Sequence, residues 1–436
     1  MLRRSNLGKT SVWVLDNKLE RAPQWGIRVG QVLTVVGPGL IVMLADTDAG
    51  SIITAAQSGA QWGYRLLFLQ IILIPVLFIV QELTVRLGIV TGRGHGELIR
   101  EQFGAGWAWL SVGTLLLACL GALVTELSGI AGVGELFGLP RWASAGAAVL
   151  LLTVVVWTGS YRSVERVAIL LGSGELAFVL VAWRAHPNTA AIMATLHSLP
   201  LGNASFLSLA AANIGAVIMP WMIFYQQSAI VDKGLKKPDL RAARFDTAWG
   251  AVLTQVVMAS ALIATAATLS GSPATATLGS VRGIARALEP YLGHTVGVSL
   301  FAVGMMGAAL VSAIVVTLTA AWALGEVLGY RHSLRTRPRE SPWFYGIYTG
   351  LLVAGALLVI MRDDLVRLTI AVEMMNALLL PIVLGFLYLL ARRALPPPYR
   401  LRGWYAVIVG IVVFLTSAFA IYAGGIVPLL DALHAR

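Results

Sequence analysis

The stretch "GLIVMLADTDAGSIITAAQSGA", residues 39–60, places two carboxylates, Asp46 and Asp48, in the middle of an apolar segment. An unpaired charge inside hydrocarbon costs at least about 2.5 kcal/mol, so such residues usually have a function. Ala49, Gly50 and Ser51 follow directly, and a break in the helix at this depth is tolerated only where it lines a cavity or is buried in protein. The stretch therefore predicts a discontinuous membrane helix with a polar site at its centre.

The composition is that of an all-α polytopic membrane protein. Of 436 residues, 58% are apolar and only 12% are charged, whereas a soluble domain carries roughly 25% charged residues. Mean hydropathy is +0.80. The single cysteine, Cys119, lies in an apolar run, which excludes a disulfide framework and a multi-cysteine metal site. The net charge of +11 comes from short basic runs between apolar segments, so we expect a lipid bilayer as partner and no nucleic acid.

About eleven apolar segments are long enough to span a membrane, which takes roughly 20 residues. Most of the 32 Lys and Arg residues fall on the side of the N-terminus. By the positive-inside rule, residues 1–30 are a cytoplasmic tail and the protein lies in the plasma or inner membrane. The predicted spans are 31–58, 64–90, 106–131, 142–161, 167–184, 206–231, 247–270, 295–329, 343–361, 368–391 and 403–429.

The sixth predicted span, "NIGAVIMPWMIFYQQSAIV" at residues 213–231, carries a second interruption at Gly215 and at Met219-Pro220. A single Gly or Pro in a membrane helix is usually a packing or kink residue. Paired interruptions in two halves of a chain instead indicate a transporter site between inverted repeats. We therefore expect one five-helix repeat at 31–185, a second at 206–392, and an additional helix 11 at 403–429.

A broken helix frees backbone carbonyls, and together with Asp48 these oxygens predict a cation site. Further neutral oxygens come from Thr47, Ser51, Gln226 and Gln227. Oxygen ligands with one or two carboxylates suit a hard ion such as Mg²⁺. Met219 instead favours a softer ion, since a thioether prefers transition metals.

Several motifs resemble those of the Nramp metal-ion transporters. In "GPGLIVMLADTDAGSIITAAQSGA" (37–60), the family's Asp-Pro-Gly-Asn motif falls on Asp48-Ala49-Gly50-Ser51. "QELTVRLGIVTGRGHGEL" (81–98) is similar to the family's second helix and exit loop, and "GAVIMP" (215–220) to its sixth-helix motif. Asn376, ahead of "LLLPIVL" (378–384), falls where the family has a polar residue near the ion.

The resemblance implies a LeuT-type fold with a 5+5 inverted repeat and discontinuous helices 1 and 6. It also implies uptake of divalent metal by alternating access. Asp48 carries over as the metal-binding carboxylate, Met219 as the thioether neighbour, and a carbonyl near Ala216 as a further ligand. The sequence departs from the family's motifs at Ala49, at Ser51 and after Pro220, and in these departures it resembles the Nramp-related magnesium transporters. Asp46 would add a second hard group for a hydrated ion.

The remaining charged residues in or near the predicted spans, and the histidines, have other expected roles. Glu82 and Arg86, spaced i,i+4, are expected to neutralise each other. Glu126 and Glu135 fall where the family has acids of its proton path, and Glu175, Glu326 and Glu373 are expected at interfaces or against Arg. No histidine lies in the sixth span, which disfavours proton coupling. The histidines, all in loops, at span ends or in the tail, are His95, His186, His197, His294, His332 and His434.

The sequence thus predicts a secondary transporter for Mg²⁺, and also for Mn²⁺, that is not proton-coupled and needs no cofactor. A proton-coupled Mn²⁺/Fe²⁺ importer that relies on Met219 is the alternative. A metal sensor that does not transport is a second alternative, disfavoured because no long hydrophilic segment could serve as an output domain. No mid-span Ser–His, Cys–His or paired histidine is present, so we expect no enzyme. A monomer is the expected unit.

Overall fold

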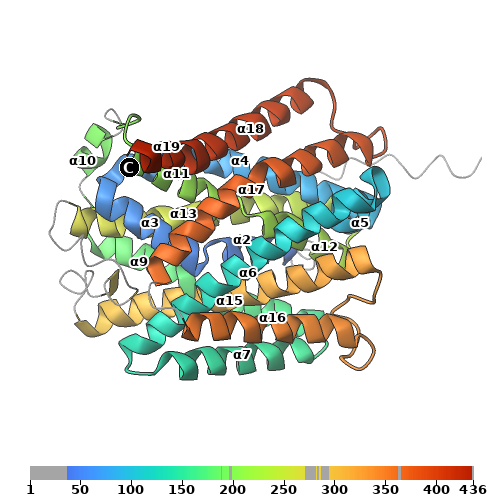
Figure 1. The fold of residues 1–436 in the computed structure, drawn as a ribbon, viewed down its shortest axis with the longest axis horizontal. Helices are drawn as coiled ribbons and strands as arrows, with labels where there is room; N and C mark the ends of the chain where they lie inside the picture. The colour runs from blue at the N-terminus through green and yellow to red at the C-terminus, as the bar shows by residue number, and fades with distance from the viewer. Residues whose placement is uncertain are drawn as a thin grey trace, which may run out of the picture.

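The computed structural model describes residues 37–187, 189–195, 199–270, 281, 284–285, 294–361 and 365–434. Within these ranges the regular structure is helical, and the long helices run along the long axis of the molecule (Figure 1). The predicted tail, 1–30, and the start of the first span lie outside the described residues. The principal helices are α2 (Pro38–Asp46), α3 (Ala49–Trp62), α4 (Leu67–Thr91), α5 (His95–Phe103), α6 (Ala105–Leu136), α7 (Arg141–Trp157), α8 (Tyr161–Gly172), α9 (Ala177–Arg184), α10 (Thr189–Thr195), α11 (Ala204–Val217), α12 (Pro220–Lys233), α13 (Leu240–Leu269), α15 (His294–Leu328), α16 (Pro342–Ile360), α17 (Leu365–Arg393), α18 (Gly403–Ile421) and α19 (Val427–His434).

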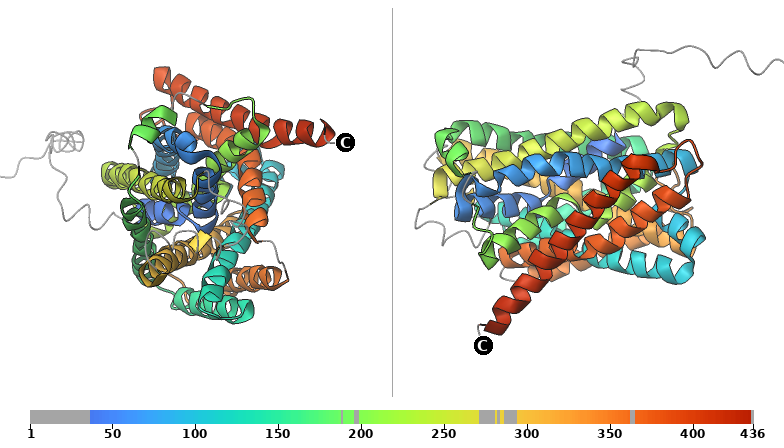
Figure 2. Two further views of the ribbon diagram at one scale, coloured as in Figure 1. Left: turned by 90° about the vertical axis from the view of Figure 1, so that its left-hand side faces the viewer. Right: turned by 90° about the horizontal axis from the view of Figure 1, so that it is seen from above.

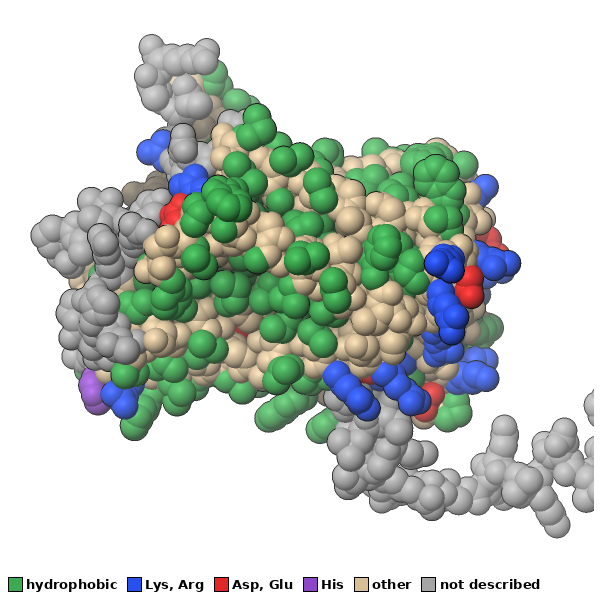
Figure 3. Space-filling model, turned by 90° about the horizontal axis from the view of Figure 1, so that it is seen from below, with side chains coloured by type: hydrophobic (Ala, Val, Ile, Leu, Met, Phe, Trp, Pro, Cys, Tyr) green, Lys and Arg blue, Asp and Glu red, His purple; other side chains and the backbone are tan. Residues whose placement is uncertain are grey.

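The protein is a multi-pass membrane protein, as predicted. In the described ranges, nine helical segments are long and apolar enough to cross a membrane. The longest, Ala49–Thr91, joins α3 to α4 through a 3₁₀ turn, and α7 is apolar but shorter. Figure 3 shows apolar side chains along the middle of the molecule and many Lys and Arg side chains gathered at one end. We call this the basic end; it carries Arg93, Arg162, Lys233, Arg335 and Arg393.

Both predicted helix breaks are present, and they lie next to each other. Helix α2 ends at Asp46 and α3 begins at Ala49, while α11 ends at Val217 and α12 begins at Pro220. Asp48 caps α3, because its Oδ1 accepts a hydrogen bond from Ser51 N at 2.6 Å. Across the two breaks, Ser51 Oγ donates to Ala216 O at 2.7 Å. The discontinuous helices are therefore confirmed, and this hydrogen bond joins them at the breaks.

Helix α17 packs closely against α11 because position 215 is a glycine. A Cβ on Gly215 would overlap Glu373 O and lie 2.8 Å from Ala377 N. Any larger residue would separate the two helices. This contact places the segment of α17 that contains Glu373 and Asn376 beside the break at Ile218 and Met219.

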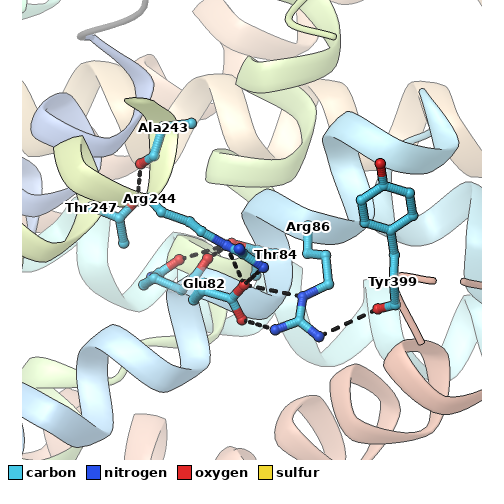
Figure 4. A network of polar contacts seen from close by, with 8 residues as sticks. Glu82, Thr84, Arg86, Ala243, Arg244, Thr247 and Tyr399 are labelled. Carbon is cyan, nitrogen blue, oxygen red and sulfur yellow. Dashed lines mark hydrogen bonds and ion pairs between the residues drawn. The ribbon is translucent and has the colours of Figure 1, made fainter. Parts of the chain in front are cut away.

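A buried ion-pair cluster ties α4 to α13 (Figure 4). Glu82 lies between two guanidinium groups, with Arg86 Nε at 3.0 Å and Arg244 Nη2 at 2.6 Å. Arg86 also donates to Tyr399 O at 3.3 Å. The predicted pairing of Glu82 with Arg86 is confirmed, and Arg244 is a second partner that the local spacing did not indicate.

Some predicted boundaries are wrong. The fifth span begins at Tyr161, not at 167, because Ser160 caps helix α8 through Ser163 N. Arg162 and Arg166, predicted in a loop, therefore lie in the first turns of α8. Helix α5, beginning at His95, was not predicted. At the other end of the chain, α18 and α19 lie across the outside of the bundle (Figure 2).

Candidate cation site at the paired helix breaks

The two aspartates of the first break are completely buried. Asp46 and Asp48 are each 0% exposed. Asp48 Oδ1 holds the cap of α3, but Asp48 Oδ2 and both carboxylate oxygens of Asp46 have no hydrogen-bond partner among the described residues. Buried polar atoms without partners are costly. These three oxygens are therefore free to bind a ligand.

Glu126, on α6, adjoins the same break. Its Oε2 accepts a hydrogen bond from Ala49 N at 3.1 Å, one residue after Asp48. The carboxyl groups of Glu126 and Asp48 are close enough to influence each other electrostatically. Glu135, the other acid considered on this helix, lies nine residues away and pairs with Arg141. Of the two, only Glu126 belongs to the site.

Glu373 and Asn376 approach the break from α17. A Cβ on Gly50 would overlap Glu373 Oε1 and lie 3.3 Å from Asp48 Oδ1, so the missing side chain leaves room for both carboxylates. Asn376 Nδ2 donates to Glu373 Oε2 at 3.1 Å. Glu373 Oε1 and Asn376 Oδ1 remain without partners in the described part of the chain. Asn376 is thus joined to the site through its contact with Glu373.

Glu175 approaches from the 3₁₀ turn Ser173–Leu176, between α8 and α9. Thr47 Oγ1 lies within hydrogen-bond reach of Leu44 O, at 3.0 Å, and of Glu175 Oε2. Glu175 Oε1 has no partner in the described ranges, and the carboxyl group is an electrostatic neighbour of Asp46 and Asp48. The Thr47 hydroxyl therefore connects the first break to a further buried acid.

The expectation that Glu175, Glu326 and Glu373 lie at interfaces or against Arg is wrong. Glu175 and Glu373 are 0% exposed, and Glu326 is 5% exposed and accepts from Gly96 N and Ser228 Oγ. The sequence contained a usable signal. Glu175 in "LLGSGELAFVL" (170–180) and Glu373 in "LTIAVEMMNALLL" (368–380) are lone carboxylates in apolar runs, as Asp46 and Asp48 are.

The thioether of the second break already has a partner. Trp221 Nε1 donates to Met219 Sδ at 3.2 Å, and Met219 is fully buried. The Ala216 carbonyl accepts from Ser51, and its second lone pair is available to a ligand. The carbonyl and the hydroxyl therefore place two hard oxygens at the junction of the breaks, and the sulfur accepts one hydrogen bond from an indole.

The two glutamines of α12 make hydrogen bonds to other helices. Gln226 Oε1 accepts from Thr84 Oγ1 at 2.6 Å, and its Nε2 donates to Thr247 Oγ1 at 2.9 Å. Gln227 Oε1 lies 2.9 Å from His95 Nδ1, and its Nε2 donates to Arg93 O at 2.9 Å. Both amides thus connect α12 to α4, α13 and α5. The assignment of Gln226 as a ligand stays a prediction.

His95 is the first residue of α5 and is fully buried. Burial lowers the pKa of His95 to about 4, although the hydrogen bond with Gln227 acts in the opposite direction. The imidazole is therefore neutral near pH 7. It belongs to the packing of α5 on α12.

Charge is the main property of this site. Within the described residues, no Lys or Arg forms an ion pair with any of its five carboxyl groups. Buried anions need a counter-charge, and a cation at the break would supply it. The carboxyl groups are those of Asp46, Asp48, Glu126, Glu175 and Glu373.

The ligand atoms available at the breaks favour a hard cation that is bound by carboxylates together with other oxygen atoms. Across the described ranges, no three His, Cys, Asp or Glu side chains converge as a ready metal centre. A cation here would therefore combine carboxylates with hydroxyl, backbone or water oxygen. Such ligands suit Mg²⁺, Ca²⁺ and Mn²⁺.

Comparisons with known proteins agree with this architecture. Residues 39–424 match the family described as natural resistance-associated macrophage protein-like (Nramp). A divalent metal cation transporter MntH of Burkholderia ambifaria is 27% identical over 432 residues, with 92% of each chain covered. MntH 1 of Pseudomonas aeruginosa is 30% identical over 294 residues, covering 63% of this chain and 65% of that protein.

Solved structures show the same fold. The Eremococcus coleocola manganese transporter superposes with a TM-score of 0.76 at 20% identity, covering 90% of this chain and 86% of that chain. MhsT, solved in complex with L-phenylalanine, gives a TM-score of 0.62 at 14% identity, covering 92% and 98%. The LeuT-type fold predicted from the sequence is confirmed.

Proposed function

Since the chain belongs to the Nramp family, we propose that it carries a divalent metal cation across the membrane by alternating access. One observation carries the proposal: two broken helices meet at a buried group of carboxylates that has no basic partner among the residues the structure describes. Half-helix ends and freed carbonyls at mid-membrane are the usual construction of an ion site in such transporters. The names of the relatives, which describe transporters of divalent metal and of manganese, support the same function.

We assign the ligands by their position at the two breaks. Asp48 Oδ2 and the Ala216 carbonyl are the central pair, and Ser51 adds a hydroxyl. Asp46 and Thr47 lie on the α2 side of the ion, and Glu373 with Asn376 lies on the α17 side. Met219 is a neighbour of the ion, and Gln226 is a weaker ligand candidate because its amide oxygen and nitrogen are already hydrogen-bonded.

Mn²⁺ is the first candidate for the cargo and Mg²⁺ the second. The sequence alone favoured Mg²⁺, but the relatives include proteins named for manganese. A carboxylate and carbonyl site accepts both ions. Mg²⁺ remains a candidate because the Met219 sulfur is engaged by Trp221, and Mg²⁺ keeps part of its water shell.

We infer the direction of transport from the position of the basic end and from the membrane potential. With the basic end in the cytoplasm, the membrane potential drives cations inward, by about 2.3 kcal/mol per charge at 100 mV. We therefore propose uptake into the cytoplasm across the cell membrane, with the N-terminus on the cytoplasmic side.

The function is tested by ion uptake into proteoliposomes of the purified protein, with Mn²⁺, Mg²⁺ and Ca²⁺ compared at equal concentrations. Saturable uptake of Mn²⁺ or Mg²⁺ that exceeds that of empty liposomes is expected. Binding without uptake of any of the three ions would contradict transport and favour the sensor alternative.

The selectivity prediction concerns the thioether. Met219→Ala should change Mn²⁺ and Mg²⁺ uptake by less than about threefold, because a sulfur engaged by an indole contributes little to binding a hard ion. Trp221→Phe is the matched variant, since it removes the donor and leaves the sulfur. Initial rates of both ions are measured in each variant. A more than tenfold loss of Mn²⁺ uptake in Met219→Ala alone would indicate direct thioether ligation.

A second prediction concerns Glu373, which the sequence analysis did not place at the site. Glu373→Gln keeps the shape and the contact with Asn376 but removes a charge from the ion. We expect the apparent affinity for the transported ion to fall on the order of ten- to a hundredfold. Glu340→Gln, in the loop before α16, is the control and should transport normally. An unchanged affinity in Glu373→Gln would remove Glu373 from the ligand set.

A third prediction concerns coupling. The sixth span contains no histidine, so we expect the ion to enter without protons. The internal pH of proteoliposomes is followed during uptake, with the potential clamped by K⁺ and valinomycin. Acidification that follows metal uptake and disappears in Asp46→Ala or Glu126→Ala would show a proton-coupled transporter instead.

A further inference from the structure

A cavity at the basic end lies apart from the ion site. It has a volume of about 900 Å³ and lies between the start of α8, the end of α12 and the segment that contains Arg335. Four cationic side chains line it, and they face a single carboxylate, Glu165. The cations are those of Arg162, Arg166, Lys233 and Arg335.

The cations differ in how they are held. Lys233 Nζ pairs with Glu165 Oε1 at 2.6 Å, and Arg335 Nη2 donates to Lys233 O at 2.6 Å. Arg162 and Arg166 are exposed, and neither pairs with a carboxylate in the described part of the chain. The cavity is therefore lined by two cationic side chains that are held by contacts within the protein and by two exposed guanidinium groups that have no carboxylate partner among the described residues.

Other features favour an oxyanion in this cavity. Helix α8 begins at Tyr161, so the positive end of its dipole faces the lining residues 159–161. Tyr161 also lines the cavity, and its hydroxyl oxygen is buried in the protein. Guanidinium groups and a helix N-terminus together match the oxygens of a phosphate.

The surface beside the cavity is apolar. Leu170 follows Arg162 and Arg166 at four-residue spacing on α8, and it is 73% exposed. Residues at this spacing share one face of a helix. Trp157, at the end of α7, is 46% exposed. A molecule with its phosphate among the arginines would therefore have apolar surface for its chains along α8.

We propose that this cavity binds the phosphate of an anionic phospholipid at the membrane surface. Basic pockets between membrane helices on the cytoplasmic side are suited to such headgroups. The proposal rests on the membrane placement of the chain and not on the transported ion. The Glu165–Lys233 pair also lies against the start of α2, since a Cβ on Gly37 would overlap Glu165 Oε1 and lie 2.8 Å from Lys233 Nζ.

The test uses the full chain in neutral detergent, with its thermal unfolding followed against added lipid. Short-chain phosphatidylglycerol should stabilise the wild type saturably, and phosphatidylcholine should not. In Arg162→Gln/Arg166→Gln the lipid concentration for half-maximal effect should rise on the order of thirtyfold. The control pair is Arg392→Gln/Arg393→Gln, which removes two cations from the same end, where they lie over Tyr388 and Phe103. It should behave as the wild type.

One further variant and one further ligand complete the test. Glu165→Gln removes the carboxylate that competes for Lys233, so it should tighten lipid binding even if the double arginine variant does not fold. Inorganic phosphate should stabilise the wild type much less than the lipid. Equal stabilisation by phosphate alone, equal loss in both arginine pairs, or no gain in Glu165→Gln would overturn the proposal.

Discussion

Uptake of Mn²⁺ and Mg²⁺ into proteoliposomes should fall to the background of empty liposomes in Asp48→Ala. The physical reason is that Asp48 is the carboxylate at the junction of the two breaks, with its Oδ2 unpartnered in the described structure. The other acids of the site approach from α2, α6, α17 and the Ser173–Leu176 turn, so this variant removes the charge at the junction itself, where a divalent cation needs an anionic ligand. Initial uptake rates, normalised to reconstituted protein, provide the measurement.

The Asp48 side chain also caps α3, which requires a matched variant. Loss of the cap alone costs about 0.5–2 kcal/mol of stability. Asp48→Asn keeps an oxygen for Ser51 N while it removes the charge, so it should fold like the wild type and still fail to transport. Glu101→Gln, at an exposed ion pair, is the control and should transport normally. Near-normal uptake by folded Asp48→Asn would show that the ion is bound elsewhere.

Glu82→Ala should destabilise the fold by about 3–5 kcal/mol, because it leaves a buried guanidinium without its partner. The Glu82 and Arg86 side chains are only 4% and 10% exposed, and Arg244 loses the same partner. The effect is measured as the fall in thermal unfolding midpoint of the protein in detergent. Glu101→Ala breaks an exposed pair with Arg93, and a cost of no more than about 1 kcal/mol is expected.

A double variant separates the loss of the pair from the loss of the residue. Glu82→Met/Arg86→Met removes both charges and fills the space with apolar side chains. Such replacements of buried ion pairs are often neutral, so most of the lost stability should return. If the double variant is as unstable as Glu82→Ala, then the Arg244 contact or the packing of α4 carries the stability.

Several features of the site and of the fold were predictable because their causes are local. Asp46 and Asp48 stand out as carboxylates in an apolar run, and the small residues after them allow the helix to break. Met219-Pro220 ends one helix and starts the next, since proline at a first helical position needs no hydrogen-bond partner. The pairing of Glu82 with Arg86 follows from their spacing on one helix.

The composition of the site depended on the tertiary structure. The sequence determined the spans, the two breaks and Asp48, because hydrophobicity and helix interruption are properties of short segments. It did not determine that Glu126, Glu175 and Glu373 meet at the first break from three other elements, or that Gln226 faces Thr84 and Thr247. The rotation of each helix about its own axis is set by packing against its neighbours, and contacts such as that of Gly215 with α17 exist only in the assembled bundle.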